Sequence, residues 1–499
     1  MPAVRVSSEH TKTTPVEARS GLDPWVHTEL PVPPKPQGLG WVHAVGPGVI
    51  VLGVSIGSGE FLLGPAAFVR HGLSLFWGVV LAITLQTIFN MEVMRYTLAT
   101  GEPVFTGFMR TRPSSKFWSC FYVLFYLLQM GWPAWAGTAA GAIFFVFAGR
   151  LAEAADATTI YLIGVVAFLA CVLILCVGRR IERTLELLNW VLVSTVLLGF
   201  LVMALFAVPG TTWAAALVGL VGFDLVQGSF QFLPAGADFF LVGALIAYSG
   251  AGGVANLTLA NWARDKGYGM GQRAGYIPAA FSGQKVNLAT TGFTFADTAE
   301  EMRRWHGWWR LVRADQWCVF FIGAVLGMVL PAVLYVTFLQ RGNDIQGLGI
   351  SAALASAVAG RNGGLLGGAV AFLGAWLLFK TQLDNLEGMV RAMTDILWTG
   401  SRRVRSWRSG DVRAVYYTVL AVLVIWGIIA MRLAQPIVLL KLGANVAGLV
   451  LVVSSLHLLY LNTRLLPPHV RPPLWRRLAL IAMALFYGFF VTLSLRSVL

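Results

Sequence analysis

The residues Gly57-Ser58-Gly59-Glu60 interrupt the first long apolar stretch of the chain, residues 43–69, where a membrane helix normally carries leucine, valine or isoleucine. Glycine weakens a helix, serine competes for backbone hydrogen bonds, and a carboxylate is costly at bilayer depth. Irregular backbone is tolerated inside a membrane only where it is buried in protein or lines an aqueous cavity. The sequence therefore predicts an opened helix that lines a substrate pocket.

The composition is that of a polytopic α-helical membrane protein. Of the 499 residues, 57% are hydrophobic and only 12% are charged. Apolar runs of about 20 residues, the length that crosses a bilayer, recur along the chain and predict about eleven spans. The spans are expected at residues 43–69, 73–98, 117–148, 158–178, 186–208, 237–263, 314–340, 365–398, 412–431, 436–462 and 474–496.

Basic residues are unevenly distributed over the predicted loops. If the amino terminus lies in the cytoplasm, the inner loops hold arginine and lysine clusters at 110–116, 179–183, 402–408 and 464–477, and the outer loops hold few. The positive-inside rule then predicts a multi-pass protein of the cell (cytoplasmic) membrane, with a cytoplasmic amino terminus and an outside carboxyl terminus. The net charge of +14 is explained by inner loops that face anionic lipid, so no nucleic acid is expected as a partner.

Two segments outside the spans carry further expectations. Residues 1–40 lack the apolar core of a secretory signal and are predicted to form a mobile cytoplasmic tail. The loop from Arg264 to about Arg313 contains an amphipathic piece, residues 298–310, with tryptophans beside arginines. Such a piece is predicted to lie along the inner membrane surface.

The sequence contains neither an ATP-binding motif nor a zinc-protease motif. A Walker loop and a His-Glu-x-x-His zinc helix are missing, and the four cysteines have neither disulfide-framework nor zinc-ligand spacing. The chain is therefore predicted not to be an enzyme and to need no cofactor. Transport, if that is its role, must be secondary or passive.

A second interruption matches the first. Ser249-Gly250-Ala251-Gly252-Gly253 divides the sixth span, which lies five spans after the first. Two glycine-broken helices in corresponding positions indicate an inverted-repeat transporter with its substrate near the membrane midplane. Close helix packing through small residues is the alternative explanation. The predicted organisation is a tail (1–40), a first five-helix repeat (41–210), a second five-helix repeat (211–463) and an additional carboxyl-terminal helix (464–499).

These segments resemble a known family. Gly46-Pro47-Gly48, then Ser58-Gly59-Glu60-Phe61, then His71-Gly72-Leu73 are similar to the opening of the Nramp divalent metal-ion transporters. The resemblance is clearest over residues 41–115 and 240–275. It implies an all-α LeuT-type fold with eleven or twelve transmembrane helices, built as a 5+5 inverted repeat with helices 1 and 6 broken.

The diagnostic metal-binding residues of that family have changed. Its Asp-Pro-Gly-Asn aligns on Gly57-Ser58-Gly59-Glu60, so the usual aspartate is absent and a carboxylate replaces the asparagine. Its Met-Pro-His falls on Gly253-Val254-Ala255, which removes the soft sulfur that favours transition metals and the histidine linked to proton coupling. The Nramp-related magnesium branch also lacks that methionine. The resemblance therefore implies a divergent branch with an all-oxygen site for magnesium or manganese.

The candidate site combines one carboxylate with backbone and amide oxygens. Glu60 and Asn256 are the expected metal ligands, aided by carbonyls exposed at the two breaks, from about Gly53 to Ile56 in the first helix. Alternatively, Glu60 only stabilises the amino terminus of the second half-helix. The predicted substrate-binding residues are Ile56, Gly57, Ser58, Gly59, Glu60, Tyr248, Ser249, Gly250, Gly253 and Asn256.

A second class of substrate remains open. Gly57-Ser58-Gly59 also resembles the Gly-Ser-Gly signature of amino-acid permeases of the same fold, in which backbone amides hold a substrate carboxylate. Glu60 opposes this interpretation because a fixed anion repels an anionic group. The sequence thus predicts alternating-access transport of a divalent cation by a chain that can work as a monomer in membrane lipid. Transport of an amino acid or other small organic solute is the alternative.

Charged residues in the eighth span form a second cluster. Lys380, Asp384, Glu387 and Arg391 follow at helical spacing on one face, which permits mutual ion pairing. They are predicted to form either a structural ladder or a coupling or gating site. His457 in the tenth span is a further candidate for coupling, because histidine titrates near neutral pH, although it could equally be held by ordinary hydrogen bonds.

Overall fold

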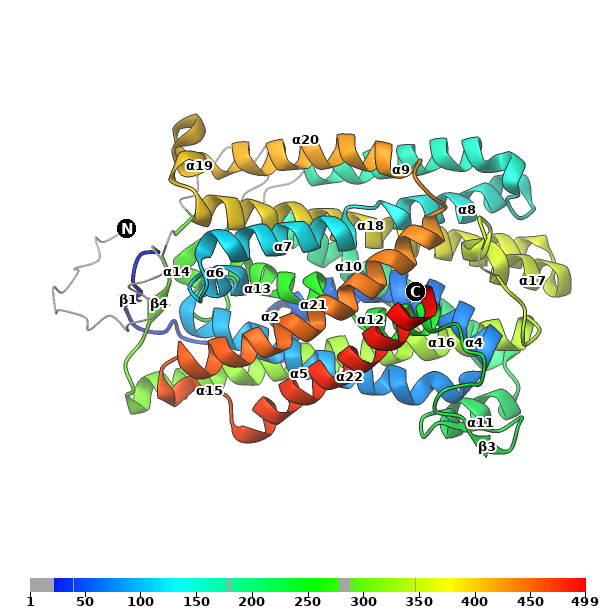
Figure 1. Cartoon of the computed structure of the whole chain (residues 1–499), viewed down its shortest axis with the longest axis horizontal. Helices are drawn as coiled ribbons and strands as arrows, with labels where there is room; N and C mark the ends of the chain where they lie inside the picture. The colour runs from blue at the N-terminus through cyan, green and yellow to red at the C-terminus, as the bar shows by residue number, and fades with distance from the viewer. Residues whose placement is uncertain (1–21, 39, 177–180, 278–287, 290, 346) are drawn as a thin grey trace.

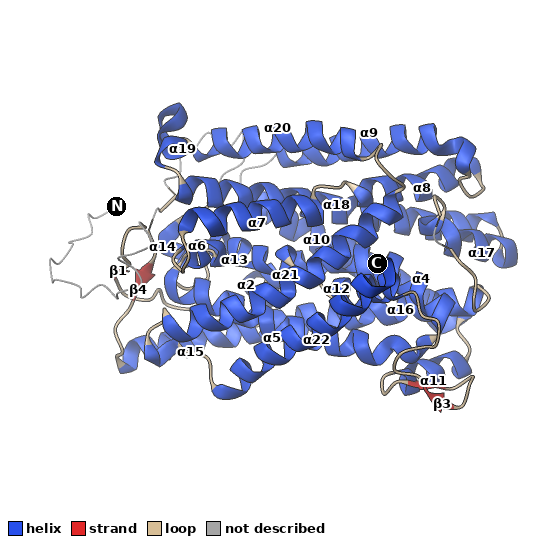
Figure 2. Ribbon diagram, viewed as in Figure 1, coloured by secondary structure: helices blue, strands red, loops and turns tan. Residues whose placement is uncertain are grey.

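The fold is given by a computed structural model, which describes residues 22–38, 40–176, 181–277, 288–289, 291–345 and 347–499. Most helices run along one common axis, and helices far apart in the sequence lie side by side in the bundle (Figure 1). Strands are confined to two small pairs (Figure 2). β1 (Val26–His27) pairs in parallel with β4 (Phe293–Thr294), and β2 (Phe223–Asp224) pairs antiparallel with β3 (Ser229–Phe230).

The first five spans occupy the first half of the described chain. A short helix α2 (Gly40–Ala44) precedes them, and α11 (Gly210–Gly219) follows them at the opposite end of the bundle (Figure 1). The spans and their connecting helices are α3 (Pro47–Ser55), η1 (Ile56–Leu63), α4 (Gly64–His71), η2 (Leu73–Leu75), α5 (Phe76–Thr100), α6 (Val104–Met109), α7 (Ser115–Met130), α8 (Ala134–Ala148), η3 (Ala154–Asp156), α9 (Ala157–Cys176) and α10 (Ile181–Ala207).

The remaining spans and their connecting helices occupy the second half of the described chain. The helices are α12 (Phe239–Tyr248), α13 (Val254–Lys266), α14 (Gly271–Ala274), α15 (Ala299–Arg313), η4 (Ala314–Phe321), α16 (Ile322–Phe338), η5 (Ile350–Ala352), α17 (Ala353–Asn362), α18 (Gly364–Gly400), α19 (Arg402–Ser406), η6 (Trp407–Gly410), α20 (Val412–Ala430), α21 (Pro436–Arg464), η7 (Pro468–Val470) and α22 (Leu474–Val498).

The predicted number of spans is confirmed. Within the described ranges, ten helices are long and apolar enough to cross a membrane, judged by length and composition. The divided helix formed by α12 and α13 supplies the eleventh. The outer surfaces carry large apolar side chains such as Leu173, Phe206 and Leu485, which are 68%, 90% and 71% exposed. Apolar surface of this extent suits a bundle that faces lipid.

The amphipathic piece predicted for the inner membrane surface has a different structure. Residues 299–310 of this piece belong to α15, which continues through η4 into α16 as one helix of 40 residues, Ala299–Phe338. Thr298 caps its start by accepting a hydrogen bond from the backbone of Glu301, and no proline or glycine separates α15 from η4. Trp305 and Trp308 are buried against protein. The prediction of a separate surface helix was therefore wrong.

The described part of the amino-terminal segment is not a mobile tail. Residues 22–38 pack on the end of the bundle, where Trp25 and Leu30 are buried. The indole of Trp25 donates to Glu102 at 3.2 Å, and the backbone amide of Leu30 donates to Glu301 at 3.0 Å. Residues 1–21 of the predicted tail lie outside the described residues. The expectation of mobility is therefore wrong for 22–38, because aromatic and backbone groups there find buried partners.

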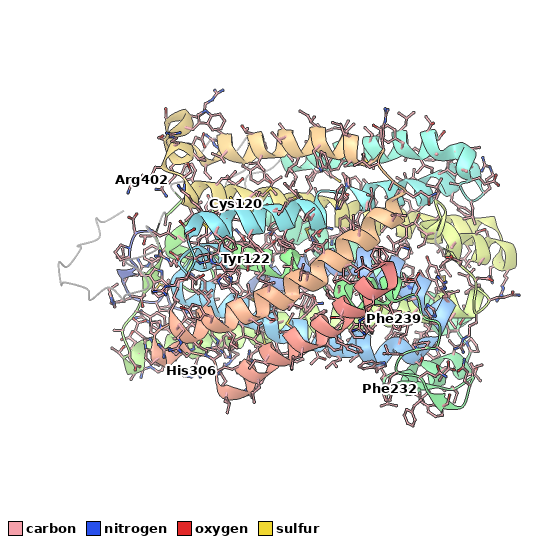
Figure 3. All side chains as sticks on the ribbon, in the orientation of Figure 1. Cys120, Tyr122, Phe232, Phe239, His306 and Arg402 are labelled. Carbon is pink, nitrogen blue, oxygen red and sulfur yellow. The ribbon has the colours of Figure 1, made fainter. Side chains whose placement is uncertain are left out.

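The four cysteines are free. Cys120, labelled in Figure 3, lies on α7 and is exposed, and Cys318 is also exposed. Cys171 is buried in the bundle. No disulfide contributes to the part of the fold that the structure describes.

Candidate functional site

The sixth span is broken where the sequence predicted it. α12 ends at Tyr248 and α13 begins at Val254. In the intervening residues, Gly250, Gly252 and Gly253 have φ angles of 97°, 80° and 55°. Only glycine adopts this left-handed backbone readily. The glycine cluster therefore opens the helix instead of merely permitting close packing.

Two glutamines from neighbouring helices satisfy the opened backbone. Gln86 of α5 donates to the carbonyl of Ser249 at 2.8 Å and accepts from the amide of Gly252 at 3.1 Å. Gln129 of α7 donates to the carbonyl of Gly252 at 3.0 Å and accepts from the amide of Val254 at 3.0 Å. Unpaired backbone groups are costly inside a membrane, so these side chains hold the break open. Sequence reasoning left them out of the site. The sequence feature that could have identified them is a single glutamine in each of two apolar spans.

The first span is not opened at the predicted interruption but changes there from an α-helix to a π-helix. Residues Ile56–Leu63 form the π-helix η1, and Ser55 and Gly64 at its two ends keep right-handed helical dihedral angles. A π-helical turn accommodates an extra residue while its backbone remains hydrogen-bonded. The expectation of an opened first helix with freed carbonyls was therefore wrong. The carbonyl of Gly53 instead accepts a hydrogen bond from Thr381 Oγ1 at 3.0 Å.

Glu60 joins this π-helix to the break in the sixth helix. Its side chain is completely buried. Its Oε1 accepts hydrogen bonds from Ser55 Oγ and, at 3.2 Å, from the backbone amide of Gly250. Its Oε2 is buried and has no hydrogen-bond partner among the residues that the structure describes. One carboxylate oxygen thus bridges two helices while the other remains unused.

Gly59 places the two helices in direct backbone contact. A Cβ atom on Gly59 would stand 2.0 Å from the carbonyl oxygen of Tyr248. Gly59, Glu60, Tyr248, Ser249 and Gly250 of the predicted set therefore meet at one junction. They form the core of the candidate site.

The other predicted residues face different neighbours. Ile56 packs against Gly327 of α16, and a Cβ on Gly57 would stand 2.0 Å from Thr381 Oγ1 of α18. A Cβ on Gly253 would stand 2.2 Å from Gln129 Oε1, which together with its φ of 55° leaves no room for a side chain there. The side chain of Ser58 lies outside the described residues.

Asn256 contributes a further unused oxygen. Its Nδ2 donates to Asn90 Oδ1 of α5 at 2.8 Å. Its own Oδ1 is buried and has no hydrogen-bond partner in the described part of the chain. No group of three or more histidine, cysteine, aspartate or glutamate side chains able to hold a metal occurs in the described residues. A metal at this junction would therefore need backbone and amide oxygens beside Glu60.

Comparison with known proteins gives the fold a name. No family model matches the chain, and no curated protein matches it. Two mutant structures of the Eremococcus coleocola manganese transporter superpose with a TM-score of 0.62 at 15% and 16% identity, covering 97% of this chain and 90% of theirs. The chain has the Nramp-type transporter fold. MhsT in complex with L-phenylalanine superposes with a TM-score of 0.52 at 14% identity, covering 93% of this chain and 99% of its own, in agreement with a LeuT-type architecture.

Within this Nramp-type fold, the charged face of α18 forms two ion pairs within the helix and one with α13. Lys380 Nζ lies 2.6 Å from Asp384 Oδ2, and Arg391 pairs with Glu387 one turn further along. Arg391 also pairs with Asp265 of α13. The predicted pairing along the helix face is therefore present. A coupling or gating role for Lys380, Asp384 and Glu387 remains a prediction.

His457 of α21 sits in a closed aromatic setting. Its Nε2 lies 2.7 Å from Thr111 Oγ1 and its Nδ1 lies 3.3 Å from the hydroxyl of Tyr122. The rings of Phe108 and Trp118 lie at centroid distances of 4.0 Å. Both ring nitrogens are thus held by neutral hydroxyl groups, which fits a packed, hydrogen-bonded histidine. A proton-coupling role for it remains a prediction.

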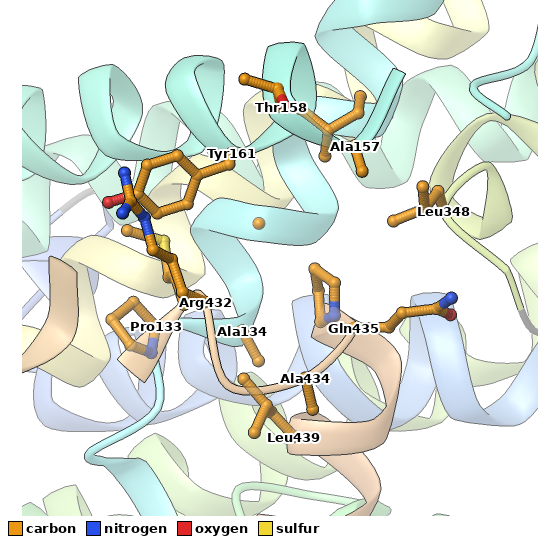
Figure 4. A pocket seen from close by; sticks show the side chains of 14 residues that line it. Pro133, Ala134, Ala157, Thr158, Tyr161, Leu348, Arg432, Ala434, Gln435 and Leu439 are labelled. Carbon is orange, nitrogen blue, oxygen red and sulfur yellow. The ribbon is translucent and has the colours of Figure 1, made fainter. Parts of the chain in front are cut away.

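A cavity of about 520 Å³ opens between the ends of α8, α9, α20 and α21. Arg432 lies over the ring of Tyr161 at 4.5 Å, and Pro133, Leu348 and Leu439 supply apolar lining (Figure 4). None of its lining residues belongs to the predicted site. This cavity is therefore separate from the junction at Glu60.

Replacing Gly59 with alanine is expected to lower transport by on the order of 100-fold, because the methyl group must push the π-helix off the Tyr248 carbonyl, a strain of a few kcal/mol. The matched control is Gly368→Ala in α18, where no atom lies within 4 Å of the added methyl group. Uptake into proteoliposomes measures the effect. Equal uptake by both variants would show that this backbone contact is not needed.

Proposed function

We propose that the protein is a secondary or passive transporter that carries divalent metal cations, magnesium or manganese, across the cell membrane by alternating access. The observation that carries this proposal is the buried Oε2 of Glu60, which has no partner among the described residues. A bare carboxylate away from water costs several kcal/mol unless a cation or proton neutralises it. Its position where the first and sixth helices meet suits a cation that is bound and then released.

The oxygen atoms that the two interrupted helices offer favour a hard cation. The carbonyl of Tyr248 abuts Gly59, and Asn256 Oδ1 is a second buried oxygen without a partner in the described chain. Magnesium and manganese prefer oxygen ligands, and magnesium keeps part of its water shell when few carboxylates are present. The solved neighbour from Eremococcus coleocola is a manganese transporter. That likeness supports the same substrate class for this chain.

Transport of an amino acid or another small organic solute is the alternative. MhsT, which was solved with L-phenylalanine, has a related fold. In the present chain, however, the amide of Gly250 at the helix break already donates to Glu60 Oε1. A backbone amide that would hold a substrate carboxylate is therefore occupied by the protein's own carboxylate. This contact favours a cation as the substrate.

A ligand screen tests the choice between these classes. The purified full-length protein is titrated with magnesium, manganese, calcium, sodium and a panel of amino acids, and its unfolding temperature is measured. A ligand that binds only the folded state raises that temperature in a concentration-dependent manner. We expect stabilisation by magnesium or manganese. Stabilisation by an amino acid without any response to metal would replace the cation proposal with the alternative.

A further inference from the structure

The cavity between α8, α9, α20 and α21 has one charged residue in its lining. Of the 14 residues that line it, Arg432 alone is charged, and Thr158, Tyr161 and Gln435 supply the other polar side chains. Its volume of about 520 Å³ falls within the range of pockets that hold small organic ligands. The cavity therefore has room for an organic molecule and presents a single fixed positive charge to it.

The guanidinium group of Arg432 is held by an aromatic ring. It lies 4.5 Å from the centroid of the Tyr161 ring at one side of the cavity, and Gln435 stands at the other side (Figure 4). The hydroxyl of Tyr161 donates to the carbonyl of Ile428 at 3.2 Å, which fixes the ring. Arg432 has no carboxylate partner among the residues that the structure describes. Its planar set of N–H donors is thus positioned and suits a carboxylate or phosphate group.

No carboxylate of the protein stands ready to fill this role. Acidic residues are missing from the described lining of the cavity. Asp156 adjoins the lining residue Ala157 in the sequence, but its carboxylate pairs with Arg150 at 2.7 Å and 2.9 Å. An anion at Arg432 must therefore come from another molecule.

The rest of the cavity is apolar and borders the lipid-facing surface. Alanine, proline, leucine and isoleucine supply most of its lining. α9 and α20 lie at one side of the bundle (Figure 1). Leu162, which follows Tyr161 in α9, is 56% exposed, and Leu433, which follows Arg432, is 60% exposed. A molecule with an apolar body can reach such a cavity from the bilayer, while an arginine at the end of a span holds its charged head.

We infer that this cavity is a binding site for an amphipathic anion, whose carboxylate or phosphate head pairs with Arg432 and whose apolar body fills the space between Pro133 and Leu439. An acidic lipid and a soluble amphipathic acid share this chemistry. The positive charge of Arg432 repels a divalent cation, so the ligand is different from the proposed substrate. The site stands on its own charge and shape and does not depend on the proposed transport function.

Direct binding tests the site. The full-length protein in phosphatidylcholine nanodiscs is equilibrated with radiolabelled octanoate, which has one carboxylate and a short apolar chain, and the signal of empty nanodiscs is subtracted. We expect saturable binding to the wild type. Arg432→Gln should weaken it by on the order of tenfold, because a charge-assisted hydrogen bond is lost. The matched control is Arg361→Gln, because Arg361 lies 5.3 Å from the ring of Phe338 and does not line the cavity. It should bind like the wild type.

Two further measurements separate a built site from a loose charge contact. Ala157→Trp places a large ring in the lining at an exposed position and should abolish saturable octanoate binding although Arg432 is retained. Octylammonium, which carries the opposite charge on the same chain, should show no saturable binding to the wild type. The inference is overturned if Arg432→Gln binds octanoate as well as the wild type does, or if octylammonium binds equally well.

The lipid composition of the nanodiscs distinguishes the two sources of the anion. If an acidic lipid is the occupant, phosphatidylglycerol in the nanodiscs should compete with octanoate for the wild type and lower its binding. Unchanged octanoate binding would assign the site to a soluble amphipathic acid. Metal uptake enters none of these measurements, so a failure of the proposed transport function would leave their result as it stands.

Discussion

Replacing Glu60 with glutamine is expected to abolish metal uptake, with a loss of on the order of 100-fold or more, while the protein remains folded. Glutamine has nearly the same shape, and its amide oxygen can still accept from Ser55 and from the amide of Gly250, as Glu60 Oε1 does. What it lacks is the negative charge that binds a divalent cation. Loss of a charged partner in a buried site is worth about 3–5 kcal/mol, which corresponds to this change in affinity. Uptake into proteoliposomes and metal titration of the purified variant measure it.

The outcome separates the two roles that remain open for Glu60. The control is the same chemical change on an exposed loop, Glu153→Gln, which should transport like the wild type. The unfolding temperature of Glu60→Gln should be unchanged or higher, because a buried charge without a cation partner has been removed. Normal uptake by Glu60→Gln would leave Glu60 as a structural bridge between the helices and would remove the main support for a cation as substrate.

The membrane spans could be predicted well because bilayer thickness fixes their length. The break in the sixth helix could also be predicted. Gly250, Gly252 and Gly253 adopt backbone angles that only glycine takes easily. The three glycines are adjacent or nearly so in the sequence, so the break can be recognised without knowledge of distant contacts. The two helices that the sequence singled out do meet, through Glu60 and the amide of Gly250.

The form of the first helix could not be predicted from its sequence. Gly57 and Gly59 there serve close approach to Thr381 and to the carbonyl of Tyr248, not an opening of the backbone. Glycine beside serine is compatible with an unwound segment and with a π-helix. The choice depends on partners that are distant in the sequence. The hydrogen bonds of Gln86 and Gln129 to the broken sixth helix were not predicted, because these partners are also distant in the sequence.

The wrong predictions for residues 22–38 and 298–310 also arose from contacts between segments that are distant in the sequence. A polar, proline-spaced segment such as residues 22–38 resembles a mobile tail until Trp25 is seen to donate to Glu102. The tryptophans of α15 resemble membrane-surface anchors until Trp308 is seen to donate to the carbonyl of Pro31. Each segment buries its aromatic residues against the other parts of the chain. Composition reports that such residues will be buried but does not identify their partner.

Replacing Arg391 with methionine is expected to lower the free energy of unfolding by about 3–5 kcal/mol. Arg391 is completely buried on α18 and pairs with Glu387 of its own helix and with Asp265 of α13. Methionine fills a similar space but leaves Glu387 without a guanidinium partner, and Asp265 keeps only its pair with Arg264. Denaturant unfolding of the purified protein, followed by tryptophan fluorescence, measures the change.

The same substitution also reports on how the two helices separate. Arg391 joins α13, the second half of the broken helix, to α18, and Arg264 of α13 makes a parallel contact with Asp395 of α18 at 2.7 Å. In an alternating-access cycle, contacts of this kind must break when that end of the bundle, predicted to face the cytoplasm, opens. The control is Arg402→Met on the exposed helix α19 (Figure 3), which should change stability by less than about 0.5 kcal/mol. If Arg391→Met is no less stable than this control, the network adds nothing to the closed state, and closure must depend on apolar packing between α13 and α18.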